Sequence, residues 1–382
     1  MNTKISARLM IMSISTLVFT SCNKHDHSPQ CDGNDKTVTT IKVFATGLNN
    51  PRGLKFGQDG NLYVAEGGIG GTNSTIGQCT QVPATGPGPS TGSDSGSRIS
   101  KIDRQGKRTT FVNYLPSSQT NEASGKAVTG MADVAFIGNT LYGLIGGGGC
   151  SHGVSSIPNG IAKAGSNGSW SLAANYSQYI LAHPGVNYEE EDYTPDGNPW
   201  NMISVDKDFY LTEANTGVLD KISSKGTVSR VVDISATQGH IVPTALTHHA
   251  GSFYVGNLGL FPIIVGSSKV FQITHDGQIS VYASGFTTIV GLAFDNRGRL
   301  YVLELSDGPG GPTPNLGKII RVDKLGNRQV IASGLNFPTA MTFGPDGNLY
   351  VSGSGIGAPG TGQVLQIGFK CELVLGDINI FN

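Results

Sequence analysis

Three glutamates and an asparagine end short, similar segments of this chain. The segments read NLYVAE, DFYLTE, SFYVGN and RLYVLE, and their last residues are Glu66, Glu213, Asn257 and Glu304. Carboxylate and amide oxygens are the ligands that Ca²⁺ and Mg²⁺ prefer in proteins. If the fold brings these segment ends together, we expect the four side chains to form a Ca²⁺ or Mg²⁺ site.

A second set of residues lies near the start of another apolar segment, which comes just before each tyrosine-containing segment. We expect this set to face the same opening and to contact a ligand there: Arg52, Asp133, Trp200, Asn201 and Thr244. His240 comes just before the segment PTALTH, so it is a candidate general acid or base. The alternative is a structural collar, in which Arg52 neutralises Glu66 and His240 bonds to a loop backbone.

A repeated unit must position these residues. A tyrosine phrase occurs six times, and its aligned tyrosines are Tyr63, Tyr142, Tyr210, Tyr254, Tyr301 and Tyr350. Their last three spacings are 44, 47 and 49 residues, which suits the four strands of a propeller blade. The two longer spacings indicate blades with insertions.

Each unit reads as four short β-strands separated by Gly, Asn and Asp turns. The sequence therefore predicts an all-β, six-bladed β-propeller of four-stranded blades over residues 39–382, with insertions near 67–97, 116–130 and 183–200. The segment Thr39–Leu48 has no blade of its own, so we expect it to close the ring as the outer strand of the last blade. The start of a first strand and the end of a second share one edge of an antiparallel hairpin, which predicts a polar rim around the central channel.

The N-terminus resembles a bacterial lipoprotein signal. Lys4 and Arg8 precede the apolar run Leu9–Phe19, and Thr20-Ser21-Cys22 follows. We expect residues 1–21 to be the signal peptide, Cys22 to carry the lipid and residues 22–38 to form a tether. The protein is then an exported lipoprotein of the periplasm or cell surface, held to the membrane by its lipid only. An ordinary signal peptide beside an incidental cysteine is the alternative.

Four further cysteines remain, and an even number in an exported chain indicates disulfides. Spacing alone allows three pairings. Cys31 lies just before the closing strand and Cys371 lies in the last repeat, so we expect Cys31–Cys371 to staple the ring. Cys79 and Cys150 then pair, which joins an insertion to a glycine-rich loop.

Several classes of function have no support in the sequence. The chain has a net charge of -1 and no basic run, so nucleic-acid binding is not expected. It contains no phosphate-binding glycine loop, no G-x-S-x-G element and no zinc-type spacing of His and Cys. We expect a monomer.

Three phrases carry a family resemblance: VFATGLNNPRGLKFGQDGNLYVAEGGIGGTNS, MADVAFIGNTLYGLIGGGGCSHGVSSIPNG and GFTTIVGLAFDNRGRLYVLE. They resemble the ScyD/ScyE family, which is named for proteins associated with scytonemin biosynthesis. The resemblance spans about residues 43–367 and implies an NHL-like or SMP-30-like propeller outside the cytoplasm. Endings such as YLTE resemble those of streptogramin lyases, whereas the starts at Pro51, Pro243 and Pro338 lack the Asn or Asp of SMP-30-type lactonases.

These features leave two functions open. As a binding protein, the propeller presents its channel rim to a small molecule or a protein partner, and we favour this interpretation because no nucleophile is identifiable. As an enzyme, it is a cation-dependent lyase or hydrolase, of the lactonase or streptogramin-lyase type, that acts at the central channel with His240 as acid or base.

Overall fold

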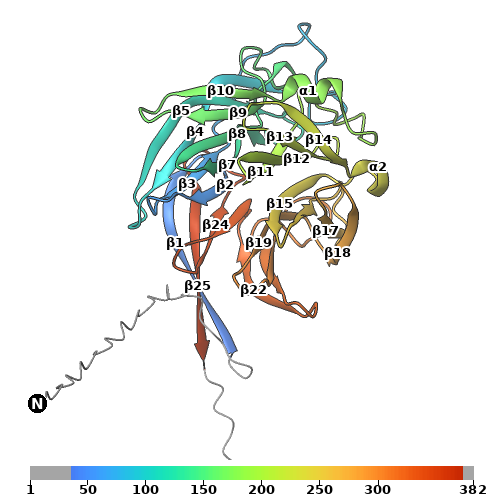
Figure 1. The fold of residues 1–382 in the computed structure, drawn as a ribbon. Helices are drawn as coiled ribbons and strands as arrows, with labels where there is room; N and C mark the ends of the chain where they lie inside the picture. Colours follow the sequence, from blue (N-terminus) through green and yellow to red (C-terminus); the bar gives the residue numbers. More distant parts are fainter. Residues whose placement is uncertain (1–35, 373–382) are drawn as a thin grey trace, which may run out of the picture.

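Six antiparallel sheets surround a common axis in the computed structural model, which describes residues 36–372 (Figure 1). The predicted six-bladed β-propeller is confirmed. The expected signal peptide, the lipidated Cys22 and the Cys31 half of the Cys31–Cys371 disulfide lie outside the described residues.

Blades 1 to 3 follow one another along the chain, and each begins with its innermost strand. Blade 1 consists of β2 (Pro51–Phe56), β3 (Leu62–Glu66), β4 (Thr91–Ile102), β5 (Arg108–Gln119) and a short fifth strand, β6 (Val128–Thr129). Blade 2 consists of β7 (Met131–Ile137), β8 (Thr140–Ile145), β9 (Gly160–Ala164) and β10 (Trp170–Asn175). Blade 3 consists of β11 (Pro199–Val205), β12 (Asp208–Glu213), β13 (Val218–Ile222) and β14 (Val228–Asp233).

Blades 4 to 6 complete the ring. Blade 4 consists of β15 (Pro243–His249), β16 (Ser252–Asn257), β17 (Ser268–Ile273) and β18 (Ile279–Phe286). Blade 5 consists of β19 (Ile289–Phe294), β20 (Leu300–Glu304), β21 (Gly317–Val322) and β22 (Arg328–Leu335). Blade 6 consists of β23 (Ala340–Phe343), β24 (Leu349–Gly353), β25 (Gly362–Glu372) and β1 (Lys36–Leu48).

The ring is closed by the two ends of the described chain. β1 pairs antiparallel with β25 and supplies the outer strand of blade 6, as predicted (Figure 1). The innermost strands form the channel wall, since each contacts the innermost strand of the next blade and β23 contacts β2. The start of every blade therefore lies near the axis.

The hydrophobic core of residues 36–372 consists of six clusters, one between each pair of neighbouring blades. The six aligned tyrosines lie in or against these clusters, and each ring contacts a phenylalanine of the next blade. The centroids are 4.5 to 5.3 Å apart in the pairs Tyr63–Phe136, Tyr142–Phe209, Tyr210–Phe253, Tyr254–Phe294, Tyr301–Phe343 and Tyr350–Phe56. Such aromatic contacts stabilise beyond simple burial, so the repeated tyrosine holds each blade to its neighbour.

The repeated phrase DGNLY has the same local role in blades 1 and 6. The Tyr63 hydroxyl donates to Asp59 Oδ2 over 2.9 Å, and the Tyr350 hydroxyl donates to Asp346 Oδ2 over 2.9 Å. Gly60 supplies the positive φ of 74° that the Asp-Gly turn requires. The repeat is therefore structural at this end of the hairpin.

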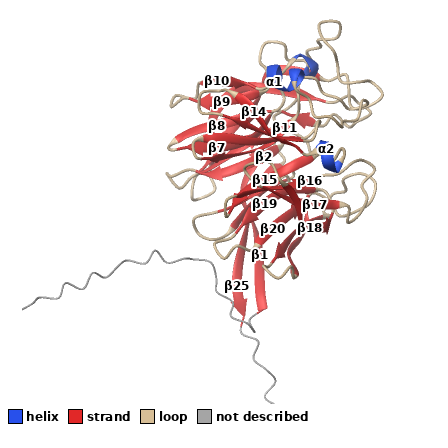
Figure 2. Ribbon diagram, turned by 45° about the vertical axis from the view of Figure 1, so that its right-hand side comes forward, coloured by secondary structure: helices blue, strands red, loops and turns tan. Residues whose placement is uncertain are grey.

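The long connections lie at one end of the propeller, which we call the insertion face (Figure 2). They include residues 67–90, 146–159, 176–198, 234–242, 258–267 and 305–316. Three of them carry the helices η1 (Cys150–His152), α1 (Ser177–Ala182) and α2 (Ser235–Gln238). The opposite end, the hairpin face, has tight turns between paired strands. No helix among the described residues is long and apolar enough to cross a membrane.

Candidate functional site

The strand-end glutamates Glu66 and Glu213 are buried and bonded within their surroundings. Glu66 accepts from the Asn49 N–H at 2.6 Å and pairs with Arg98 Nε at 2.8 Å. Glu213 accepts from the N–H groups of Asn198 and Thr216, both at 2.7 Å, from the Asn215 N–H at 3.1 Å and from the Thr216 hydroxyl at 2.6 Å. The neighbour that neutralises Glu66 is thus Arg98 rather than Arg52.

The other two expected cation ligands are engaged in the same way. Glu304 accepts from the Thr287 N–H at 2.9 Å and lies 3.2 Å from Lys318 Nζ, while burial raises the pKa of this carboxyl. Asn257 Oδ1 accepts from the Lys269 N–H at 2.7 Å. In residues 36–372 the three glutamates form no group within ligand distance of a shared ion. The structure places each of the four in its own blade and does not bring them together.

A β-bulge at the start of the innermost strand, present in five of the six blades, decides where the rim side chains point. In blades 1 to 5 the pairing register shifts between the first residue of that strand and a residue two or three positions later. A bulged residue leaves the regular alternation of the strand and is re-aimed. The pattern puts Trp200, rather than Asn201, at the position equivalent to Arg52 and Thr244.

Asp133, Asn201 and Thr244 connect the innermost strands of neighbouring blades. Asp133 Oδ2 accepts from the Met202 N–H at 2.8 Å and from the Asn201 side-chain amide, and Asn201 Oδ1 accepts from the Leu246 N–H at 2.7 Å. The Thr244 hydroxyl donates to the Ile289 carbonyl of the next blade. Burial raises the pKa of Asp133 to about 6. These three side chains are used within the channel wall.

Arg52 differs from these residues because its charge has no partner. Its Nη2 donates to the Val128 carbonyl at 2.7 Å and its Nη1 to the Gly355 carbonyl. Among residues 36–372, no carboxylate lies within ion-pair distance of this guanidinium. Burial lowers the pKa of Arg52 to about 10, so the group stays positively charged at neutral pH.

Trp200 lies beside this guanidinium, with the Arg52 Cζ 5.9 Å from its ring centroid. Both residues line a narrow crevice together with Thr129 and Asn198. The crevice adjoins a cavity of about 100 Å³ under the insertion face, because Thr129 and Asn198 also line that cavity. Arg52 and Trp200 therefore lie in a narrow crevice next to this cavity.

The cavity is lined mainly by polar side chains from blades 1 to 3 and their connections, among them Ser118, Thr129, His152, Asp192, Asn198 and Asn215. His152 Nε2 lies 3.0 Å from the Gly197 carbonyl, to which it donates, and its Nδ1 lies 3.1 Å from the Ser118 hydroxyl. Burial lowers the pKa of His152. His152 is thus a neutral cross-link between connections rather than a free base.

Asp192 lies where the cavity meets a cluster of possible metal ligands. One ligand atom each of Glu189, Asp192 and His240 lies within 4.8 Å of the others. Burial raises the pKa of Asp192 to about 6. His240 does not bond to a loop backbone, since both of its ring nitrogens are buried without a hydrogen-bond partner.

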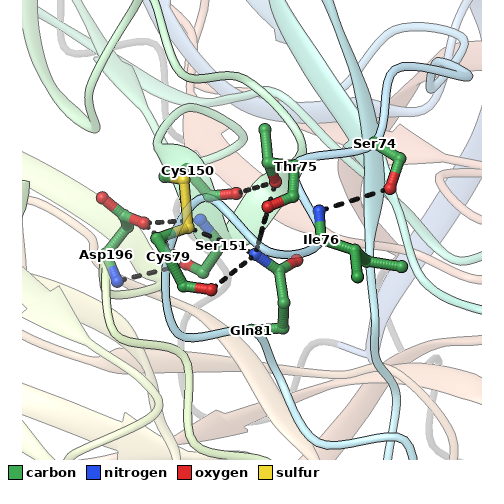
Figure 3. Close-up of a disulfide and its surroundings, with 8 residues drawn as sticks. All are labelled: Ser74, Thr75, Ile76, Cys79, Gln81, Cys150, Ser151 and Asp196. Atoms are coloured by element: carbon green, nitrogen blue, oxygen red, sulfur yellow. Dashed lines mark hydrogen bonds between the residues drawn. A yellow bond between two sulfur atoms is a disulfide. The ribbon is translucent and has the colours of Figure 1, made fainter.

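The predicted disulfide Cys79–Cys150 is confirmed, and it ties the connections of this face together (Figure 3). It joins residues 67–90 to residues 146–159. Ser151 next to it donates its hydroxyl to Asp196 Oδ2 at 2.8 Å, which adds residues 176–198. Three connections that line the cavity are therefore held to one another.

Sequence reasoning missed Asp192, Glu189 and Asn215 as members of a site. The run Glu189–Asp192 carries a visible signal, four consecutive acids, but such runs are usually solvated. The informative feature is the proximity of this run to His240 across two connections. Only the fold shows that proximity.

A scan against protein-family models found no match, and neither did a search of curated proteins. Among solved structures, the chain is similar to a protein of unknown function from Bacteroides thetaiotaomicron (11% identity, 88% of this chain and 77% of that chain, TM-score 0.56). It is similar to a putative glucose dehydrogenase from Thermus thermophilus (16% identity, 87% and 100%, TM-score 0.52) and to a gluconolactonase from Xanthomonas campestris (10% identity, 90% and 96%, TM-score 0.53). At these identities the likeness shows the fold alone, a β-propeller.

Proposed function

We propose that this protein binds a small molecule with an anionic group at the channel rim of the insertion face, with Arg52 as the anchor. The observation that carries the proposal is the half-buried guanidinium of Arg52, which no carboxylate of residues 36–372 neutralises. A buried charge is normally paired, because removing it from water is costly. A ligand carboxylate or phosphate would supply the missing partner.

The surroundings of Arg52 support a specific rather than a diffuse site. Three main-chain carbonyls accept from Nη1 and Nη2, those of Pro51, Gly355 and Val128, which fixes the plane of the guanidinium without cancelling its charge. Trp200 offers a flat surface beside it. The adjoining cavity of about 100 Å³ is smaller than a typical drug-sized site, so it suits a small polar molecule or one functional group of a larger ligand.

The test uses tryptophan fluorescence, since the chain has only two tryptophans. In a Trp170→Phe background, lactate, gluconate, citrate and inorganic phosphate are titrated against the remaining Trp200 signal. We expect a saturable change with at least one of them. Because a charge-assisted hydrogen bond is lost, Arg52→Gln should weaken that binding by roughly tenfold or more.

The matched control is Arg104→Gln, which removes an exposed arginine of the hairpin face. It should leave the affinity unchanged while lowering the net charge by the same amount. If Arg52→Gln bound every probe as tightly as the parent protein, the rim would not be the binding site.

A second candidate function is a cation-dependent hydrolase or lyase acting at the same rim, with His240 in the site. One observation favours it: Asp192 lines the cavity and also lies beside two further potential ligands. Gluconolactonases among the structural neighbours make lactones a sensible first substrate class. Lactone hydrolysis that a chelator abolishes and a divalent cation restores would support this function, and hydrolysis unaffected by chelator would contradict it.

We further infer from the sequence that the protein is a member of the ScyD/ScyE family and an exported lipoprotein anchored through Cys22. The apolar run and the cysteine that follows it support the anchor. Carbonate washing of membranes should release the Cys22→Ala protein and retain the parent. Equal release of both proteins would reject lipidation.

A further inference from the structure

We propose that Glu189, Asp192 and His240 form a binding site for a divalent first-row transition metal ion, such as Zn²⁺, on the insertion face. The site differs from the Ca²⁺ or Mg²⁺ site expected at the strand ends, and its residues come from two connections, 176–198 and 234–242. The inference is independent of the proposed rim ligand, because metal binding is measured by itself.

The three side chains bring their ligand atoms close enough to share one ion after small side-chain adjustments. Their ligand atoms lie within 4.8 Å of one another, yet no hydrogen bond or ion pair joins His240 to either carboxylate among the described residues. Direct bonding would need shorter contacts. A cation between the three groups would bond to all of them without moving the backbone far.

His240 provides the independent sign that something binds here. Its Nδ1 and Nε2 are both buried, and neither has a hydrogen-bond partner. Leaving a buried polar atom unsatisfied costs about 1–3 kcal/mol, and such atoms are uncommon in native structures. Coordination of one ring nitrogen to a metal removes that cost for the coordinating atom.

Asp192 is held in place for ligation by Asn215. The Asn215 side-chain amide donates to the Asp192 carbonyl at 2.8 Å and to its Oδ1 at 3.1 Å, which leaves Oδ2 available. Asn215 is itself fixed because its N–H donates to the buried Glu213 at 3.1 Å. Such outer hydrogen bonds orient metal ligands. Glu213, expected to be a ligand, is therefore a positioning residue two steps from the proposed ion.

The ligand set indicates the class of metal. An imidazole nitrogen suits Zn²⁺ and other first-row transition metals, whereas Ca²⁺ and Mg²⁺ prefer oxygen ligands only. Three protein ligands leave at least one coordination position for water or a ligand group. Because Asp192 also lines the cavity of about 100 Å³, that coordination position would border the cavity.

The experiment is calorimetric titration of Zn²⁺ into the chelator-treated full chain, with Ca²⁺ in a parallel titration. We expect about one Zn²⁺ per chain at this site and tighter binding of Zn²⁺ than of Ca²⁺. Asp192→Asn and His240→Gln should each weaken Zn²⁺ binding roughly tenfold or more, since each removes a direct ligand. Co²⁺ loading adds a spectroscopic readout, because its visible absorption should change in the His240→Gln protein.

Three control variants separate this site from other Zn²⁺ ligands in the chain. Glu190→Gln removes a neighbouring acid outside the cluster, His275→Gln breaks the His248–His275 pair of the hairpin face, and a joint change of His25 and His27 to Gln alters the N-terminal tail. All three should keep the site, and unfolding midpoints verify that every variant is folded. The proposal is overturned if His240→Gln and Asp192→Asn bind Zn²⁺ like the parent, or if a control variant abolishes binding.

Discussion

Blades 1 to 3 and blades 4 to 6 are built from the same repeat but use the start of their innermost strands differently. In blades 4 and 6, Thr244 and Thr339 donate their hydroxyls to the carbonyls of Ile289 and Pro51 in the next blade. These hydroxyls are satisfied by the backbone. In blade 1 the equivalent position holds Arg52, whose hydrogen bonds to carbonyls leave its charge without a partner.

The connections of the two halves also differ. The disulfide and the polar cavity belong to blades 1 to 3 and to the connections between them. The comparison teaches that a polar residue at a propeller rim indicates a binding site only when its charge or a polar atom has no partner in the neighbouring blade. By that criterion Arg52 and His240 are functional candidates, while Thr244, Asn201 and Asp133 are parts of the wall.

The largest expected effect comes from disrupting the packing of blade 1 against blade 2, by filling the space between β2 and β7. An added Cβ at Gly53 would lie 1.7 Å from Asp133 Oδ1 and 2.7 Å from the Asp133 Cα. Gly53→Ala should therefore reduce the free energy of unfolding by about 3 kcal/mol or more, measured by denaturant unfolding. Gly311→Ala is the matched control, because nothing lies within 4 Å of its added Cβ. A similar loss in both variants would contradict this packing.

The wall of the first half should also give the protein a pH dependence of stability. Burial raises the folded pKa of Asp133 to about 6, above the value of about 3.9 for an unfolded aspartate. The folded state thus holds this proton more tightly than the unfolded state does. The contribution of Asp133 to the free energy of unfolding is therefore fully present below about pH 4 and is lost as the pH rises through 6. The loss amounts to roughly 3 kcal/mol. The unfolding free energy should fall more steeply with pH across this range in the parent than in Asp133→Asn, which keeps the raised pKa of Asp192. Equal slopes would refute the assignment to Asp133.

The strand-end glutamates offer a comparison between the two halves at matched positions. Glu213 accepts hydrogen bonds on both oxygens from the backbone of two connections, whereas Glu304 accepts one backbone bond and pairs with Lys318. Glu213→Gln replaces one carboxylate oxygen with an NH₂ group. This group cannot accept a hydrogen bond, so it would face backbone N–H donors without a partner. Glu213→Gln should cost about 2 kcal/mol of unfolding free energy, and Glu304→Gln clearly less. The reverse order would show that the ion pair to Lys318 dominates.

The smallest expected effect concerns blades 4 to 6, in which the rim threonines donate to backbone carbonyls. Thr339→Val keeps the shape of the side chain but removes the hydroxyl that donates to the Pro51 carbonyl at 2.6 Å. The variant should lose about 1 kcal/mol of unfolding free energy. Binding at Arg52 should change by less than this, since the same carbonyl accepts only a long bond of 3.4 Å from Arg52 Nη1. A change in binding larger than the change in stability would mean that the two halves are coupled.

The fold could be predicted from the sequence because its signal is local and repeated. Each tyrosine phrase encodes a hairpin and a contact to the next blade, as the Tyr63–Phe136 and Tyr350–Phe56 pairs show. The closing strand was predictable as well, since Thr39–Leu48 had no blade of its own.

The site was less predictable, for two physical reasons. A β-bulge at the rim re-aims the side chain it contains, so aligning Pro199 with Pro51 makes Trp200 equivalent to Arg52 but does not show where either side chain points. The proximity of Asp192 and His240 depends on how two irregular connections fold over blade 3, and no periodic pattern encodes that. His240 was identified by its place before β15 as a candidate general acid or base or a ligand, but its partners Glu189 and Asp192 were not.

The pairing of β1 with β25 has a consequence for how the protein is made. β1 is the first described strand to leave the ribosome, and its partner is the last. Throughout synthesis, β1 therefore has an unpaired edge, and unpaired edges invite association with other chains. Ring closure is also a contact of very large sequence separation, which slows folding. We therefore expect the nascent chain to depend on protection by a chaperone until blade 6 is complete.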